Sequence, residues 1–133
     1  MILRHVDRAR EALDKSLEVR EEVGIPFGEP LNIYDLCDSL SPRVRVRFAP
    51  YSMEGCYCGG DRPLIEVSAL RPIGRRAFST AHELGHHILG HAGMRLDERL
   101  AFGRGGSIDP DESAANAFAG FLLMPKIGVR KAF

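Results

Sequence analysis

The sequence predicts a small α+β domain. Two short segments, 43–48 and 63–67, have the apolar patterning of β-strands, whereas longer segments at 4–23, 77–90 and 109–124 repeat apolar residues at helical spacing. With 133 residues and no repeat or linker, the chain is long enough for one hydrophobic core and too short for two. We therefore expect residues 1–133 to form one domain, with a short β-sheet beside a central helix and a second functional helix.

Composition and charge restrict the partners of the chain. It is 44% hydrophobic and carries 18 basic and 18 acidic residues, so its formal net charge is zero. A balanced charge argues against nucleic-acid binding through bulk electrostatics. No apolar run approaches the roughly 18 residues of a membrane span, and the N-terminus lacks the apolar core of a signal peptide. These features predict a cytoplasmic protein that binds neither nucleic acid nor membranes directly.

The cysteines support an intracellular protein. There are three, an odd number, and Cys56 and Cys58 are separated by a single residue. That spacing favours neither a zinc knuckle nor a redox pair with two intervening residues. We interpret Cys37, Cys56 and Cys58 as reduced, packed thiols, with metal ligation as the alternative.

The first half of the chain predicts two helices and three strands. Helix 4–23 ends at the Gly24–Pro30 turn region, and a short helix at 31–40 ends before Pro42. Strand 43–48 alternates strictly, and its arginines are interpreted as a solvated face in preference to a phosphate-binding patch. A strand at 51–57 contains Gly55, which would let another backbone approach closely. The third strand is 63–67.

The segment 77–90 carries the most informative motif. His82, Glu83 and His86 form the pattern H-E-x-x-H. On a helix, residues four apart lie about 40° apart around the axis, so both imidazoles can reach one Zn²⁺ ion. Glu83 lies about 100° from His82, where it can hold the water that fills an open coordination position. Ala77, Ala81, Leu84 and Ile88 form the opposite, apolar face of this helix, which begins near Pro72.

A long polar connection precedes the last helix. It runs from His91 to Asp109, and we expect one or two helical turns in its apolar patch, Leu96 to Phe102. Its length and glycines predict a mobile segment or lid at 92–106. Asp109 and Pro110 then predict the start of a helix that runs to Met124, where Pro125 ends it.

The last helix offers a third metal ligand. Glu112 would complete a set of two histidines and one carboxylate with a position left for water. Asn116, four residues later on the same face, could hydrogen-bond a ligating histidine and fix its tautomer. Two alternatives remain open, because Glu112 also fits the third position of a capping box begun by Asp109, and Asp111 is a competing ligand. Small residues in this helix, including Ala115 and Gly120, would allow close packing against the H-E-x-x-H helix.

A second histidine pair does not fit the same metal site. His87 and His91 are four residues apart, but on a continuous helix they would lie well over 90° from His82 and His86. The longer pattern H-E-x-x-H-x-x-G-x-x-H also fails, because Leu89 and Ala92 stand where Gly and His are required. The third ligand is therefore expected to be a carboxylate from elsewhere.

Two stretches carry a family resemblance. Residues 78–86 and 112–125 closely resemble the ImmA/IrrE family of zinc-dependent metallopeptidases. The resemblance implies a small zincin-like fold of the gluzincin type, with a sheet beside two metal-bearing helices. It also implies that His82, His86 and Glu112 bind zinc, that Glu83 is the catalytic base, and that the substrate is a helix-turn-helix repressor. Only eight residues follow Pro125, fewer than in many relatives, which predicts reduced or altered substrate recognition.

The sequence therefore predicts a zinc metalloendopeptidase. The alternative is a non-proteolytic, zinc-containing module that pairs with a repressor or antitoxin. A structural zinc site normally has four protein ligands, so a set of three favours catalysis. Tyr51, Tyr57 and Arg104 are candidates for stabilising the oxyanion, and the sequence alone does not choose between them.

Overall fold

The helices and strands follow the predicted α+β order. The computed structural model describes residues 5–40, 44–50, 54–91, 94–97 and 109–123. Its elements are α1 (His5–Val23), α2 (Ile33–Leu40), β1 (Arg45–Ala49), β2 (Gly55–Cys58), β3 (Leu64–Ser68), α3 (Ile73–Ile88), β4 (Met94–Asp97) and α4 (Pro110–Leu123). Asn32 caps α2, since its side-chain Oδ1 accepts hydrogen bonds from the N–H groups of Tyr34 and Asp35. None of the described helices is both long and apolar enough to cross a bilayer.

One prediction for the long connection is wrong. Residues 94–97 form strand β4, where Leu96 and Asp97 were expected to begin one or two helical turns. The reason is tertiary, because β4 pairs antiparallel with β2, from Gly55↔Asp97 to Cys58↔Met94. A neighbouring strand supplies backbone partners that a four-residue sequence pattern cannot reveal. The rest of the expected lid, 98–106, and residues 92–93 lie outside the described residues.

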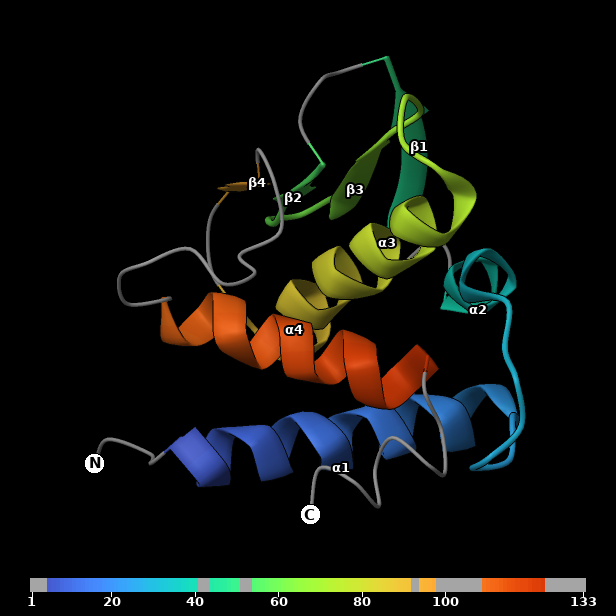
Figure 1. Cartoon of the computed structure of the whole chain (residues 1–133), viewed down its shortest axis with the longest axis vertical. Coiled ribbons are helices and arrows are strands. Elements are labelled where there is room, and N and C mark those ends of the chain that lie inside the picture. The colour runs from blue at the N-terminus through green and yellow to red at the C-terminus, as the bar shows by residue number, and fades with distance from the viewer. Residues whose placement is uncertain (1–4, 41–43, 51–53, 92–93, 98–108, 124–133) are drawn as a thin grey trace.

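The four described strands form one mixed sheet in the order β1-β3-β2-β4. β1 and β3 are parallel, whereas β2 is antiparallel to both β3 and β4. Figure 1 shows α3 between this sheet and α4, with α1 along the other side of α4. The core follows this layering: Ile65 and Val67 of β3, Leu84 of α3 and Phe118 of α4 are all fully buried. Helix α3, which carries H-E-x-x-H, is therefore the central element.

Helices α3 and α4 approach closely at a glycine. A Cβ added to Gly85 would lie 3.1 Å from Phe118 Cδ1 and 3.2 Å from both Cα and the carbonyl oxygen of Ala115. The small residue Ala115 contributes to this contact as expected. Gly120 does not, because an added Cβ there would meet nothing within 4 Å. The backbone separation of the two helices therefore depends on Gly85.

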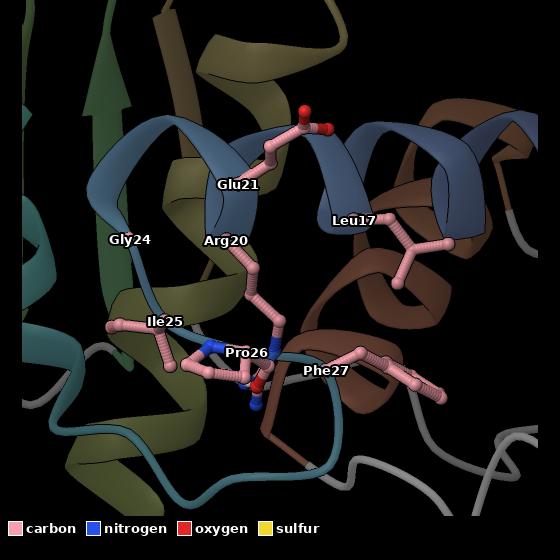
Figure 2. A pocket seen from close by; sticks show the side chains of 7 residues that line it. All are labelled: Leu17, Arg20, Glu21, Gly24, Ile25, Pro26 and Phe27. Carbon is pink, nitrogen blue, oxygen red and sulfur yellow. Dashed lines mark hydrogen bonds between the residues drawn. The ribbon is translucent and has the colours of Figure 1, made fainter.

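A buried arginine fastens α1 to the end of α4. Arg20 is 1% exposed, and its guanidinium donates hydrogen bonds to the carbonyl oxygens of Pro26 at 3.0 Å, Glu29 at 2.8 Å and Leu122 at 2.8 Å. The carbonyl of Leu122 is among the last four of α4, which have no partner within the helix. Figure 2 shows the Arg20 side chain pointing from α1 into the turn at Pro26, beside a hollow of about 430 Å³. Burial lowers the pKa of this guanidinium.

A cluster of charged side chains fixes the start of α3 beside β2. The Glu54 side chain is 1% exposed and pairs with Arg75 and, at 3.4 Å, with Arg71. The carbonyl of Glu54 also accepts a hydrogen bond from the N–H of Ser68 at 3.2 Å. Because Glu54 directly precedes β2, these contacts set the position of that strand relative to α3.

Two cysteines pack as apolar residues. Cys37 and Cys56 are 2% and 4% exposed, and burial raises the pKa of each thiol to about 12. Cys58 lies beside Cys56, with 3.6 Å between the two Sγ atoms. A thiol with so high a pKa stays protonated near neutral pH, as expected for a packing residue.

The helix contact at Gly85 makes a stability prediction. We expect Gly85→Val to lower the free energy of unfolding by at least about 1–3 kcal/mol, because its side chain would enter the backbone of α4. Gly120→Val is the matched control, and its free energy of unfolding should stay within about 0.5 kcal/mol of the wild type. Urea denaturation monitored by circular dichroism measures both. Equal stability of the two variants would contradict the proposed contact.

Candidate metal centre

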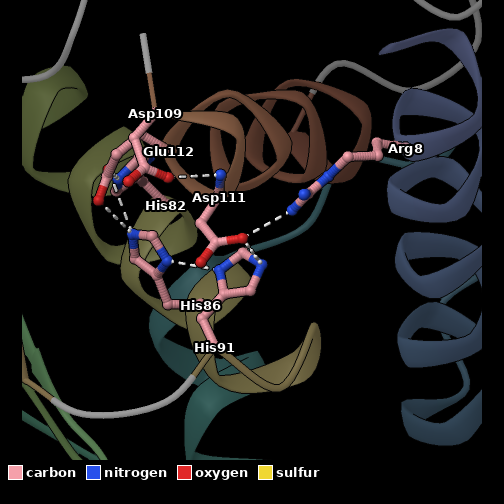
Figure 3. A network of polar contacts seen from close by, with 7 residues as sticks. All are labelled: Arg8, His82, His86, His91, Asp109, Asp111 and Glu112. Carbon is pink, nitrogen blue, oxygen red and sulfur yellow. Dashed lines mark hydrogen bonds and ion pairs between the residues drawn. The ribbon is translucent and has the colours of Figure 1, made fainter. Parts of the chain in front are cut away.

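Helices α3 and α4 bring three of the predicted site residues together. His82 Nε2 lies 2.9 Å from Glu112 Oε2, and His86 Nε2 lies 3.2 Å from the same oxygen. One ligand atom from each residue lies within 4.8 Å of the other two. Both histidines are fully buried, whereas the Glu112 side chain is 18% exposed. Figure 3 shows the two imidazoles and the carboxylate pointing toward one another from the two helices.

This donor set fits zinc. Two imidazole nitrogens and one carboxylate oxygen are ligands that Zn²⁺ commonly takes, at about 2.0–2.2 Å each. The present separations let one ion reach all three atoms. Three protein ligands leave one tetrahedral position for water or substrate, which is the arrangement of catalytic sites.

The charge of Glu112 suits a ligand. Burial by itself raises the pKa of this carboxyl, but hydrogen bonds from His82 and His86 and their charge outweigh that effect. The net pKa of Glu112 lies well below its usual range. The carboxylate is therefore ionised over the physiological range, which is the form that binds a metal.

The capping alternative for Glu112 is not what the structure shows. Asp109 caps α4 itself, because its Oδ1 accepts a hydrogen bond from the N–H of Asp111 at 2.7 Å and its carbonyl accepts one from Ser113 at 3.0 Å. The carboxylate of Glu112 points to the two histidines instead. Its position in the first turn of α4 also places its charge at the positive end of the helix dipole.

Glu83 lies against strand β2. The residue is fully buried, and a Cβ added to Gly55 would lie 2.9 Å from its Oε2 and 3.2 Å from its Cγ. Gly55 was expected to admit another backbone. The close neighbours are the Glu83 side chain and, at 3.4 Å, the carbonyl oxygen of Glu66. Glu83 and Gly55 thus pack together where α3 meets the sheet.

The remaining predicted residues take other positions. Asp111 is not part of the ligand cluster, since its carboxylate pairs with Arg8 at 2.7 Å and His91 at 3.4 Å. The Oδ1 atom of Asn116 is buried and has no hydrogen-bond partner among the described residues. The role of Asn116 in fixing a histidine tautomer therefore stays a prediction.

One oxyanion candidate is held by a histidine. Tyr57 is 5% exposed, its hydroxyl lies 2.9 Å from Nδ1 of His87, and its ring stacks at 6.4 Å from the ring of His86. Burial raises the pKa of this phenol, so it remains a neutral hydrogen-bonding group. Tyr51 and Arg104 lie outside the described residues.

The sequence reasoning missed His91. Its Nδ1 lies 2.7 Å from Nδ1 of the predicted ligand His86, although the helical extrapolation placed it far around the axis. Helix α3 ends at Ile88, so that extrapolation does not apply. Gly90 was the signal that could have found this contact, because glycine after a helix commonly takes the left-handed conformation that reverses the chain.

Comparison with known proteins agrees with the predicted resemblance. No curated protein matches the chain. A family model does match: residues 38–133 fit the peptidase M78 model, described as the IrrE N-terminal-like domain. This segment contains the H-E-x-x-H helix and all of α4, whereas α1 lies outside it. Because the match covers well over half of the chain, the protein belongs to the peptidase M78 family of IrrE N-terminal-like domains.

Proposed function

We propose that the protein is a zinc-dependent metalloendopeptidase. The observation that carries the proposal is the convergence of His82, His86 and Glu112 within 4.8 Å of one another, with Glu83 on the same helix. Membership of a peptidase family supports the reaction class. The bound zinc would supply a Lewis acid that lowers the pKa of water towards 7 and polarises a carbonyl.

The proposed hydrolysis of a peptide bond needs metal ligands and a general base, and different residues would take these roles. His82, His86 and Glu112 would hold the ion. Glu83 would act as the general base that takes a proton from the attacking water and returns it to the leaving amine. Full burial of Glu83 excludes bulk water from that carboxylate, and Gly55 limits the directions in which it can move.

We further propose that the substrate is a helix-turn-helix repressor in the cytoplasm. This substrate class comes from the resemblance of residues 78–86 and 112–125 to repressor-cleaving metallopeptidases. The zero net charge is consistent with a protein substrate and does not favour direct binding to DNA. Cleavage would relieve repression of the genes that the repressor controls.

The ligand assignment is tested by metal content. We expect one Zn²⁺ per chain, and Glu112→Gln should lose most of it because the neutral amide is a much weaker ligand. Asp111→Asn should lose far less, because its side chain lies outside the ligand cluster. Inductively coupled plasma mass spectrometry on purified variants measures the number of zinc ions per chain. A larger loss in Asp111→Asn than in Glu112→Gln would contradict the assignment.

The role of Glu83 is tested separately. Glu83→Gln should retain zinc and fold while cleavage of a candidate repressor slows by roughly 10²–10⁴-fold, the usual contribution of general acid–base catalysis. Fragments of a candidate helix-turn-helix repressor are followed by mass spectrometry. Cleavage at the wild-type rate would exclude the assigned role. Stable complex formation without cleavage by the zinc-loaded wild type would favour the binding module over the enzyme.

The contact with β2 gives a further prediction. Gly55→Ala should displace the Glu83 carboxylate, because the new methyl group would lie 2.9 Å from Oε2. We expect its cleavage rate to fall at least tenfold while zinc content stays at the wild-type value, since a misplaced catalytic group is costly. Gly74→Ala, whose added Cβ meets nothing within 4 Å, is the control. Unchanged cleavage by Gly55→Ala would show that Glu83 tolerates the displacement.

A further inference from the structure

At the end of α3 the chain reverses and brings His91 back against the helix. Gly90 has a φ of +76° in the left-handed region. The N–H of Gly90 donates to the carbonyl of His87 at 3.2 Å, and the N–H of His91 donates to the carbonyl of His86 at 2.9 Å. These two bonds form a Schellman motif, which favours glycine because other residues adopt this φ only with strain.

This turn places the His91 ring beside Nδ1 of the proposed metal ligand His86. The Nδ1 atoms of His91 and His86 lie 2.7 Å apart, with ring centroids 5.0 Å apart. The other ring nitrogen of His86, Nε2, faces Glu112. The His91 side chain is 8% exposed, so water competes little for the contact.

Two more residues continue the contact to helix α1, as Figure 3 shows. Nε2 of His91 lies 3.4 Å from Oδ1 of Asp111, and Nη2 of Arg8 donates to the same oxygen at 2.7 Å. Asp109 accepts a hydrogen bond from the backbone of Asp111 and so fixes it in the first turn of α4. Arg8, Asp111, His91 and His86 therefore form one continuous row of polar contacts from α1 to the metal centre.

Only one direction of hydrogen bonding gives each contact in this row both a donor and an acceptor. Arg8 is a donor and the Asp111 carboxylate is an acceptor, so Asp111 favours the His91 tautomer that carries its hydrogen on Nε2. Nδ1 of His91 is then an acceptor, and the hydrogen between the two rings must belong to Nδ1 of His86. That tautomer leaves the lone pair of His86 on Nε2, the atom that would bind the metal in place of the hydrogen that it shares with Glu112 in the metal-free protein. With the opposite direction of hydrogen bonding, Nε2 of His91 would face the Asp111 carboxylate without a hydrogen. His86 would then carry its hydrogen on Nε2, the atom that a metal needs.

We infer that His91, Asp111 and Arg8 are positioning residues that hold His86 in the tautomer and orientation required for metal binding. The inference rests on the proposed zinc site. It gives α1, which lies outside the family-matched segment 38–133, a part in the metal affinity of the domain. The side chains of Arg8 and Asp111 are 29% and 30% exposed, so their ion pair contributes little to folding by itself. The ion pair acts instead by orienting the His91 ring.

Zinc affinity of the purified full chain tests this inference. The dissociation constant is measured by competition with a chromophoric zinc chelator, and thermal melting checks the fold of each variant. We expect His91→Phe to weaken zinc binding on the order of 10–100-fold, as is typical when the hydrogen-bond partner of a ligating histidine is lost. Arg8→Met should weaken it in the same direction by less, and Arg8→Lys should recover part of the loss because the positive charge returns.

Two further variants separate orientation from general damage. Lys15→Met removes a charge from another ion pair of α1, with Glu18, and should leave zinc affinity within twofold of the wild type. Gly90→Ala strains the turn that places His91 without a clash, since an added Cβ meets nothing within 4 Å, and should weaken zinc binding as His91→Phe does. Imidazole ¹⁵N resonances of the metal-free protein report the tautomer directly: the fraction of His86 that carries a hydrogen on Nδ1 should be lower in His91→Phe than in the wild type.

The outcomes distinguish this inference from the proposed function. If the wild type binds zinc and His91→Phe binds it within twofold as tightly, the positioning role is overturned and the zinc site stands. If the wild type binds no zinc, both are overturned. A loss of affinity in His91→Phe with an unchanged His86 tautomer would also contradict the inference, because the loss would then have a different cause.

Discussion

The close contact of α3 with α4 is the constraint on which the candidate metal centre depends. His82 and His86 lie on one helix and Glu112 on the other, so the ligand atoms meet only if the two backbones approach at the right distance. Gly85 permits this approach, with Ala115 and Phe118 directly opposite. A glycine inside a helix is intrinsically unfavourable by about 1 kcal/mol relative to alanine. Its presence between the two histidines is explained by packing, because a side chain there would push Glu112 away.

The site combines full burial with a high density of ionisable groups. His82, Glu83 and His86 are all fully buried, and an isolated buried charge would strongly destabilise the fold. Side chains and backbone of neighbouring elements surround these three residues closely. Glu112 faces the two imidazoles, Tyr57 packs on the ring of His86, and β2 passes Glu83 at a glycine. The same elements therefore support both the stability of the core and the chemistry proposed for it.

Helix α1 shows how a segment outside the family match can matter to the site. It packs along α4, and two of its arginines contact opposite ends of that helix: Arg8 pairs with Asp111 in the first turn, and Arg20 binds the carbonyl of Leu122 near the last. Because α4 carries Glu112, these contacts help to set the position of a candidate ligand. A domain of this size buries a limited core, so charged contacts of this kind contribute a larger share of its organisation.

The sequence by itself determined the elements whose signals are local. Helical periodicity predicted α1, α3 and α4, strand patterning predicted β1 and β3, and the spacing of His82, Glu83 and His86 predicted a shared helix face. Glu112 was predicted as a ligand from its place on the last helix and from the family resemblance, and the structure brings it beside the two histidines. The tertiary structure decided the rest: β4 forms only because β2 offers it backbone partners, Glu112 points to two histidines instead of a cap, and Asp111 pairs with Arg8, 103 residues away in sequence. His91 reaches His86 only because the chain reverses at Gly90. These contacts depend on how helices approach and chains turn in space, and a periodic pattern along one element carries no such information.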